Sequence, residues 1–245
     1  MPCLRLHEAA HAMKTLLLCL CIVLSASTLQ AGECVILLHG LCRTSASMEK
    51  LESALADAGF IVLNVDYPSR TGTIEALSET VIGAALQDTR LLDCSKIHFV
   101  THSLGGILVR SYFKRHGNAR LGRVVMLGPP NQGSEVVDRL GSWVVFKKIN
   151  GPAGGELGTG AESAPCTLGP VDFELGVIAG DRSINWLNSM LIEGPDDGKV
   201  SLERTKVAGM KEHSVVHATH PYLMKNDDAI ALTIRFLKTG SFQTR

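Results

Sequence analysis

The sequence predicts an α/β fold in which a mostly parallel sheet of about six strands carries helices on both faces. Short apolar runs alternate with segments of helical periodicity through the front half of the chain. These runs are continuously apolar, which is typical of strands buried on both faces of a parallel sheet. At 245 residues the chain is long enough for one such domain or two small ones, and no internal repeat is visible.

The elements can be assigned in chain order from these patterns. Four helices are expected where apolar side chains recur every three or four residues, over 48–58, 74–85, 104–116 and 223–237. The six expected strands cover residues 34–38, 60–65, 97–102, 124–127, 175–179 and 214–217.

Residues 131–170 interrupt this alternation, because they are rich in glycine and lack a regular apolar period. We expect a lid-like insertion over the carboxyl edge of the sheet rather than a second domain. Its apolar cluster at residues 143–146 (Trp-Val-Val-Phe) either faces lipid or packs the insertion onto the core, and the sequence favours packing.

The amino terminus predicts a secretory signal peptide over residues 1–31. Met13 and Lys14 precede about ten apolar residues, and small and polar residues follow up to Ala31. We therefore expect translation to start at Met13, cleavage after Ala31, and a mature domain over 32–245 that is periplasmic or secreted. The alternative is an uncleaved membrane anchor, but the apolar run is short for a span of about 20 residues.

The mature chain keeps four cysteines, which an exported protein can oxidise. Cys34 opens the first expected strand and Cys94 precedes the third, so a disulfide and two buried free thiols are both compatible with the sequence. Cys42 and Cys166 have no metal-ligand spacing. The 24 basic and 24 acidic residues balance, and no basic patch with interleaved aromatic residues indicates nucleic-acid binding.

The most informative segment is 97–106, where an apolar run ends at Thr-His-Ser-Leu-Gly-Gly and a helical pattern begins. Ser103 is thus expected on a sharp turn between strand and helix, with the N–H of Leu104 at the helix N-terminus. This is the arrangement of the nucleophile elbow of α/β-hydrolases, although Thr101 replaces the first glycine of Gly-x-Ser-x-Gly. The alternative is an ordinary helix-capping serine.

A serine nucleophile needs a histidine base and an acid that orients it. His220 is the expected base because it lies between the last strand and the last helix, with His217 as the alternative. His213 falls at the opposite end of the short strand. Asp181, which directly follows a strand, and Asp196 and Asp197, which lie in a turn, are the candidate acids. Gly40 allows the N–H of Leu41 to face the N–H of Leu104 as a second oxyanion donor.

The chain resembles the α/β-hydrolase superfamily, and within it small secreted bacterial lipases and esterases. The matching segments are 39–41 (His-Gly-Leu), 102–106, 128–134 (Gly-Pro-Pro-Asn-Gln-Gly-Ser) and 197–200 (Asp-Gly-Lys-Val). The resemblance implies an α/β-hydrolase fold and a catalytic triad of Ser103, Asp197 and His220. It also implies an oxyanion hole from the amides of Leu41 and Leu104, and it requires no metal or organic cofactor.

The same resemblance implies a serine hydrolase that cleaves carboxylic esters with lipid-like acyl groups through an acyl-enzyme. A thioesterase, an amidase or an acyltransferase would use the same residues. A binding module that keeps the fold without catalysis is the alternative from another class. The expected partner is a small-molecule or lipid ester, with contact to a membrane surface, while the oligomeric state is unknown.

Overall fold

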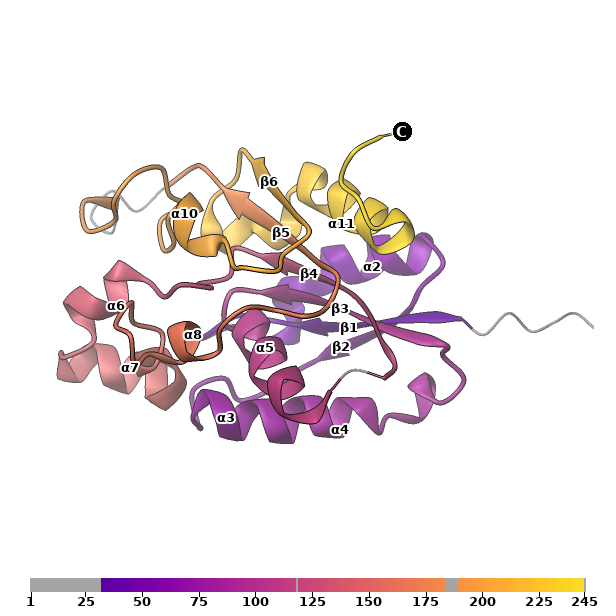
Figure 1. The fold of residues 1–245 in the computed structure, drawn as a ribbon, viewed down its shortest axis with the longest axis horizontal. Helices are drawn as coiled ribbons and strands as arrows, with labels where there is room; N and C mark the ends of the chain where they lie inside the picture. The colour runs from indigo at the N-terminus through magenta and orange to yellow at the C-terminus, as the bar shows by residue number, and fades with distance from the viewer. Residues whose placement is uncertain (1–31, 118, 184–188, 245) are drawn as a thin grey trace, which may run out of the picture. The chain divides into compact units, whose positions relative to one another are not determined.

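The computed structural model describes residues 32–117, 119–183 and 189–244, so the predicted signal peptide lies outside the described residues. The described chain contains a six-stranded sheet with the order β2-β1-β3-β4-β5-β6, in which every neighbouring pair is parallel (Figure 1). The predicted α/β class and the number of strands are confirmed. The strands are β1 Glu33–Leu38, β2 Ile61–Val65, β3 Lys96–His102, β4 Leu121–Leu127, β5 Leu175–Gly180 and β6 Glu212–Val216.

Helices cover both faces of the sheet, and each face has its own apolar core (Figure 1). Alternate residues of β1 serve the two cores: Ile36 and Leu38 pack with the helices α3 and α5, and Val35 and Leu37 with α2 and α11. Both sets are apolar, which explains the continuous apolar run. The helices are α2 Glu49–Asp57, α3 Ile74–Leu77, α4 Gly83–Leu86, α5 Leu104–His116, α6 Glu135–Leu140, α7 Val144–Gly155, α8 Ala164–Thr167, α10 Leu202–Thr205 and α11 Asp227–Thr239, with 3₁₀ turns at Ser45–Met48, Thr89–Leu91 and His220–Lys225 and a π turn at Ser78–Ile82.

The order of the strands places two loops side by side at the carboxyl edge. β1 lies between β2 and β3, and Leu38 at the end of β1 pairs with Thr101 near the end of β3. The loop after β1 leads to α2 on one face of the sheet, and the loop after β3 leads to α5 on the other face. Open α/β sheets form their binding crevice at such a switch point. The segment after β1 therefore meets the segment after β3 at the place where a binding site is expected.

The insertion at 131–170 forms α6, α7 and α8 beyond the carboxyl ends of the strands (Figure 1). Buried Arg110 on α5 holds it, because the guanidinium donates hydrogen bonds to the carbonyl oxygens of Asn131 (2.8 Å), Pro165 (3.1 Å) and Gly169 (2.7 Å). Burial lowers the pKa of Arg110 to about 10, so the side chain stays charged at neutral pH. The prediction of an insertion at this edge thus agrees with the observed fold.

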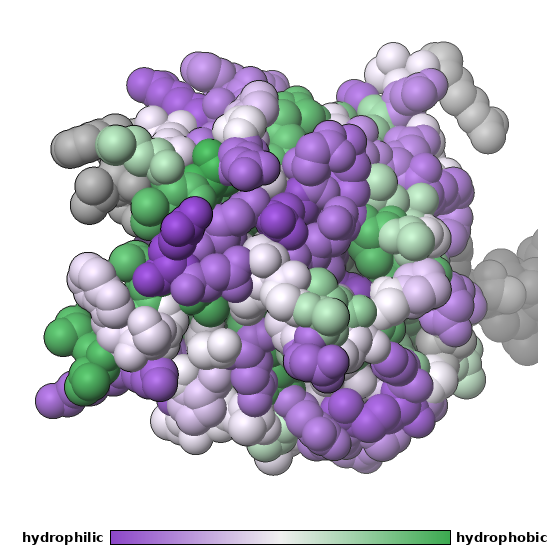
Figure 2. Space-filling view, turned by 60° about the vertical axis from the view of Figure 1, so that its left-hand side comes forward, coloured by the Kyte–Doolittle hydropathy of each residue, from purple (hydrophilic) through white to green (hydrophobic). Residues whose placement is uncertain are grey.

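The prediction that residues 143–146 pack onto the core is wrong. Trp143, Val144 and Val145 are 62%, 80% and 66% exposed, and only Phe146 turns toward the interior. Hydrophobic side chains also stand out from the molecular surface in Figure 2. The cluster lies at the start of α7, a helix that is broken at Gly151 (φ 66°) next to Pro152. None of the described helices is long and apolar enough to cross a membrane.

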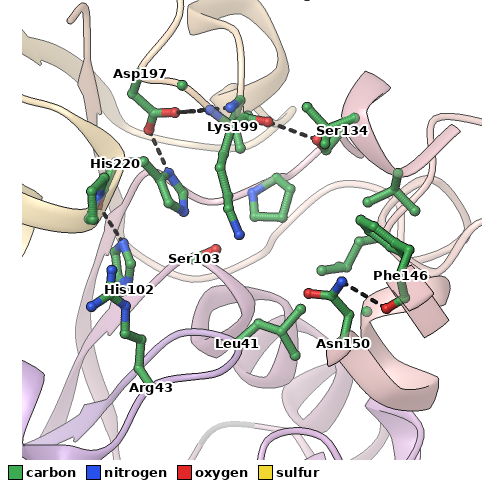
Figure 3. A pocket seen from close by; sticks show the side chains of 18 residues that line it. Leu41, Arg43, His102, Ser103, Ser134, Phe146, Asn150, Asp197, Lys199 and His220 are labelled. Carbon is green, nitrogen blue, oxygen red and sulfur yellow. Dashed lines mark hydrogen bonds and ion pairs between the residues drawn. The ribbon is translucent and has the colours of Figure 1, made fainter. Parts of the chain in front are cut away.

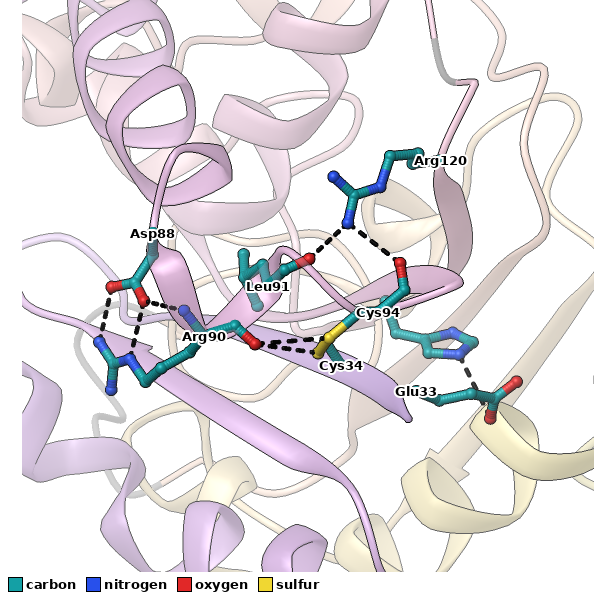
Figure 4. The surroundings of a disulfide bond; sticks show 8 residues. Glu33, Cys34, Asp88, Arg90, Leu91, Cys94 and Arg120 are labelled. Carbon is teal, nitrogen blue, oxygen red and sulfur yellow. Dashed lines mark hydrogen bonds and ion pairs between the residues drawn. A yellow bond between two sulfur atoms is a disulfide. The ribbon is translucent and has the colours of Figure 1, made fainter. Parts of the chain in front are cut away.

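Cys34 and Cys94 form a disulfide at the amino end of the sheet (Figure 4). Their Cα atoms are 5.9 Å apart, and 60 residues separate them in the sequence. Arg120 fixes the same corner by donating hydrogen bonds to the carbonyl oxygens of Cys94 and Leu91. Of the two arrangements compatible with the sequence, the structure therefore has the covalent one, while Cys42 and Cys166 remain free thiols.

Replacing both Cys34 and Cys94 with serine is expected to lower the free energy of unfolding by about 4 kcal/mol. The cross-link restricts a long loop in the unfolded chain, and the entropic model gives this magnitude for a loop of such length. Urea unfolding with and without dithiothreitol measures the effect, and the double variant serves as the control because the reductant should not change its midpoint. Equal stability of the oxidised protein and the double variant would contradict the prediction.

Candidate active site

Ser103 stands on the sharp turn that was expected between β3 and α5. Its backbone has φ 51° and ψ −118°, a region that non-glycine residues rarely adopt. The turn is held by hydrogen bonds from the Ser103 N–H to the Leu127 carbonyl (2.9 Å) and from the Gly106 N–H to the Ser103 carbonyl (3.0 Å). Gly105 is required for space, since a Cβ there would lie 2.8 Å from the carbonyl oxygen of Leu38. Strain of this kind is typical of functional sites.

Thr101 occupies the position at which the elbow pattern has glycine. The residue is fully buried in β3, between its sheet partners Leu38 and Met126. Gly106 on α5 leaves room for it, because a Cβ at Gly106 would lie 3.2 Å from Thr101 Oγ1. Within the described chain this hydroxyl has no hydrogen-bond partner. The threonine therefore fits sterically, but at the cost of an unsatisfied polar group.

Thr101→Val is expected to raise the free energy of unfolding by about 1 kcal/mol, because it removes a buried hydroxyl that makes no hydrogen bond. Thr233→Val is the matched control: Thr233 is equally buried, but its hydroxyl donates to the Ala229 carbonyl at 2.7 Å. The control should be neutral or destabilised in the same urea titration. Destabilisation of both variants by a similar amount would contradict this account of Thr101.

The loop after β1 is shaped by His39 and Tyr67. The Tyr67 hydroxyl donates to the His39 carbonyl (2.6 Å), and the two rings stack with centroids 4.1 Å apart. His39 Nδ1–H donates to the Gly40 carbonyl (2.9 Å), and Nε2 accepts from the Tyr67 N–H (3.2 Å). Burial lowers the pKa of His39, so the ring is neutral and structural. Leu41, which follows, lines a cavity together with Ser103.

Asp197 and His220 are joined by a buried hydrogen bond at the carboxyl edge. His220 Nδ1 lies 2.7 Å from Asp197 Oδ2, and the His220 N–H also donates to the Asp197 carbonyl at 2.8 Å. Asp197 Oδ1 accepts hydrogen bonds from the N–H groups of Lys199 (3.0 Å) and Val200 (2.9 Å). Because the carboxylate accepts from Nδ1–H, His220 Nε2 is left as an acceptor. The ring lies between Asp197 and Ser103 in Figure 3.

Of the candidate acids and bases, the structure brings Asp197 and His220 together. Asp181 pairs instead with His217, at 2.9 Å between Oδ1 and Nδ1, and His217 is on the surface with 74% of its side chain exposed. Asp196 accepts hydrogen bonds from Ser189 Oγ (2.8 Å) and the Gly198 N–H (2.6 Å), so it shapes the turn. His213, at the start of β6, lies 2.9 Å from the Thr205 hydroxyl.

His102 is a site residue that the sequence reasoning missed. Its ring is buried, and Nε2–H donates to the carbonyl oxygen of His220 at 3.0 Å. Burial, and then the nearby His220, hold the pKa of His102 well below its usual value, so the ring is neutral. A Cβ at Gly40 would lie 2.6 Å from His102 Nδ1. His102 therefore contacts both the loop after β1 and the backbone of His220. In the sequence, only its position next to Ser103 could have indicated this role.

These elements surround a cavity of about 280 Å³ (Figure 3). Ser103 and His220 lie on its wall, and the insertion supplies much of the remaining lining. No cluster of three potential metal ligands occurs among the residues that the structure describes. The lining residues are Leu41, Arg43, His102, Ser103, Pro130, Ser134, Val136, Val137, Phe146, Asn150, Gly154, Leu157, Asp197, Gly198, Lys199, Val200, His220 and Pro221.

Solved structures of bacterial lipases and related proteins share this fold. The mature lipase BlEst2 of Bacillus licheniformis superposes with a TM-score of 0.65 at 19% identity, covering 85% of this chain and 93% of that one. The product of the gene lin2722 of Listeria innocua superposes with a TM-score of 0.58 at 18% identity, covering 87% of this chain and 96% of that one. Phospholipase PlaB of Legionella pneumophila gives 0.58 at 20% identity, covering 71% of this chain and 45% of that one.

The family itself is shown by a match at the level of sequence. No curated protein matches the chain significantly. A sequence model of the Alpha/beta hydrolase family, however, matches residues 35–173, which include the loop after β1, the Ser103 turn and the insertion. That match spans more than half of the chain. The protein belongs to the alpha/beta hydrolase family.

Proposed function

We propose that this protein is a serine hydrolase that cleaves carboxylic esters with lipid-like acyl groups. The observation that carries the proposal is the buried Asp197–His220 hydrogen bond at the cavity into which Ser103 projects from a strained turn. The lipase and phospholipase names of several structural neighbours support ester hydrolysis in general. Ser103 is the proposed nucleophile, His220 the base and Asp197 the acid that orients it.

The proposed reaction is acyl transfer through a covalent intermediate. His220 Nε2 takes the proton of Ser103 Oγ as this oxygen attacks the ester carbonyl carbon. The N–H groups of Leu41 and Leu104 hold the negative charge that develops on the carbonyl oxygen. His220 then gives its proton to the leaving alcohol, and water repeats the sequence on the acyl-enzyme. Asp197 accepts from Nδ1–H throughout and stabilises the imidazolium that forms.

The walls of the cavity favour an apolar acyl group. Phe146, Val136, Val137 and Leu157 of the insertion face it with side chains that cannot hydrogen-bond. The exposed start of α7 extends this apolar character to the surface of the molecule, because Trp143, Val144 and Val145 have no cover.

We propose that this apolar start of α7 contacts a membrane or lipid surface. Lys147 and Lys148, also exposed, flank it and would favour an anionic surface. Export as a periplasmic or secreted protein, directed by residues 1–31, remains part of the proposal. The disulfide supports it, since such bonds persist mainly in oxidising compartments.

A fluorophosphonate probe tests the proposed nucleophile directly. The folded protein is expected to gain one covalent adduct on the peptide that contains Ser103. Its rate of hydrolysis of p-nitrophenyl esters should fall in proportion to the fraction of protein that is labelled. A folded protein that is not labelled at Ser103 and hydrolyses no ester would overturn the proposal. A series of p-nitrophenyl esters of increasing chain length then measures how much acyl chain the cavity accepts.

The alternative activities share the same residues, so matched substrates must separate them. An ester, a thioester and an amide of one acyl chain distinguish an esterase from a thioesterase and an amidase. Adding an acceptor alcohol detects an acyltransferase, because transfer to the alcohol would then exceed transfer to water. We expect hydrolysis of the ester to be the fastest of these reactions.

A further inference from the structure

Two cations lie on the wall of the same cavity and have no part in the proposed triad. Arg43 lies in the loop after β1, and Lys199 follows Asp197 in the turn before α10. Figure 3 shows the Lys199 ammonium pointing into the cavity toward Ser103, with Arg43 beside His102. Arg43 also borders a neighbouring surface hollow with Pro221, so it lies on the side of His220. Both cations therefore sit where a substrate would pass or bind.

Neither cation is held in an ion pair within the part of the chain that the structure describes. Among the described residues, neither Arg43 nor the Lys199 ammonium takes part in an ion pair. Asp197 is the one carboxylate among the described lining residues, and its oxygens are engaged by His220 and two backbone N–H groups. Two cations thus face one carboxylate, and the cavity carries a net positive charge.

The two cations act on the same cavity and repel each other. Both side chains are exposed in part. Desolvation of the Lys199 ammonium lowers its pKa and the charge of Arg43 lowers it further, while interactions with Cys42 and Asp197 raise it. The charges of Arg43 and Lys199 also lower the pKa of His102. An anion bound between the two cations would relieve this repulsion, and Arg and Lys are the side chains that proteins use to bind phosphate.

The cavity is polarised along its length. Phe146 and Asn150 of α7 lie on the side opposite Arg43, and Ser103 lies between the two ends (Figure 3). In the proposed reaction His220 protonates the leaving alcohol, so the alcohol lies on the side of His220 and Arg43. The acyl chain then points toward the apolar side chains of the insertion.

We propose that the preferred substrates are esters whose alcohol portion carries a phosphate group, bound by Arg43 and Lys199 close to the scissile bond. This inference rests on the proposed ester hydrolysis and adds the class of alcohol. The bond that breaks remains the carboxylic ester, and the phosphate is not transferred. The phosphate can belong to a lipid headgroup or to a soluble phosphorylated alcohol, since both present the same group to the two cations.

A matched pair of soluble substrates tests the proposal: a short-chain monoacylglycerol and the same compound phosphorylated on its glycerol. Both are used below their micellar concentrations, so that attraction to a charged surface plays no part. We expect kcat/KM for the phosphorylated ester to exceed that for the neutral ester at least tenfold. We also expect inorganic phosphate to inhibit competitively. Equal rates on the two esters would overturn the inference and leave ester hydrolysis intact.

Substituting each cation tests whether Arg43 and Lys199 cause the preference for the phosphorylated ester. Lys199→Met and Arg43→Met are each expected to lower the ratio of the two kcat/KM values by roughly 10- to 100-fold, the effect of a lost charge-assisted hydrogen bond. Lys96→Met is the matched control, because Lys96 opens β3 at the amino end of the sheet and is exposed. A fall of equal size on both esters would mean that Lys199 acts on the developing oxyanion, and would overturn the assignment.

Two further results separate the remaining possibilities. If a preference appears only on vesicles of anionic lipid and not with the soluble pair, then surface charge causes it and the cavity assignment is wrong. If the soluble pair and the vesicles both show the preference, a lipid headgroup is an accepted source of the phosphate. If neither ester is cleaved and Ser103 is not labelled by a fluorophosphonate, the proposed function has failed and not merely the class of alcohol.

Discussion

Replacing Ser103 with alanine is expected to lower kcat for ester hydrolysis by about 10⁴- to 10⁶-fold, the range found when a serine nucleophile is removed. Alanine keeps a Cβ of the same size, so the strained turn between β3 and α5 should persist. What disappears is the oxygen that bonds to the acyl group. The residual rate should come from the cavity and the oxyanion donors acting on a water molecule.

Initial rates on a p-nitrophenyl ester measure this loss, and urea unfolding shows that the variant is folded. Ser53→Ala is the control: Ser53 is exposed on α2, and its hydroxyl donates only to the Glu49 carbonyl of its own helix. The control should keep wild-type kcat and KM. A folded Ser103→Ala protein with more than about one tenth of the wild-type rate would rule out the serine mechanism, given the size of the expected loss.

Replacing Asp197 with asparagine is expected to lower kcat by about 10⁴-fold with little change in KM. The carboxylate accepts the Nδ1–H of His220, which leaves Nε2 free to take the serine proton. An asparagine can donate to Nδ1 instead, which puts the proton on Nε2 and removes the base. The negative charge that stabilises the imidazolium is also lost.

Asp181→Asn is the matched control, because Asp181 also pairs with a histidine, but with the exposed His217. It should keep kcat within about threefold, as expected for a surface pair. Loss of activity in Asp181→Asn but not in Asp197→Asn would mean that the acid is wrongly assigned. Loss in both variants at unchanged stability would indicate that the two Asp–His pairs are coupled.

The sheet was predictable because its central strands β1, β3, β4 and β5 are buried and largely apolar. In β1 the alternate side chains enter two different cores, so both faces demand apolar residues and the run is easily recognised. The helices α2 and α11 were predictable because each buries one apolar face. In α5 the first two turns are buried all round, but its apolar residues still recur at helical spacing. The helix expected over 74–85 is in fact α3, a π turn and α4 in succession, a distinction that periodicity does not resolve.

The insertion was less predictable because its helices do not follow the usual pattern, in which a continuous helix buries its apolar face. α7 contains Pro152 and a break at Gly151, and its first turn exposes the apolar residues Trp143, Val144 and Val145. An apolar cluster predicts burial when only the sequence is known, since most such clusters are buried. The observed exposure depends on how the insertion sits on the sheet, which no local pattern encodes.

The candidate site likewise has a part that the sequence could predict and a part that it could not. The proposed order of Ser103, Asp197 and His220 along the chain is the one typical of the expected fold, so these candidates could be chosen from the sequence. The choice between Asp181 and Asp197 needed the resemblance, because Asp181, which directly follows β5, fits the sequence pattern equally well. The contacts of His102, and the approach of Lys199 and Arg43 to one cavity, depend on side-chain directions that only the folded chain defines.

The position of β5 and β6 on one side of the sheet has a consequence for the protein during its synthesis. Ser103 follows β3 near the centre of the sheet, whereas His220 follows β6, the last strand to be made and an edge strand. A chain emerging from the ribosome in order can therefore build β1 to β4 and present Ser103 long before its base exists. In the proposed mechanism, hydrolysis therefore waits until β6 has joined the edge of the sheet and His220 has reached Asp197.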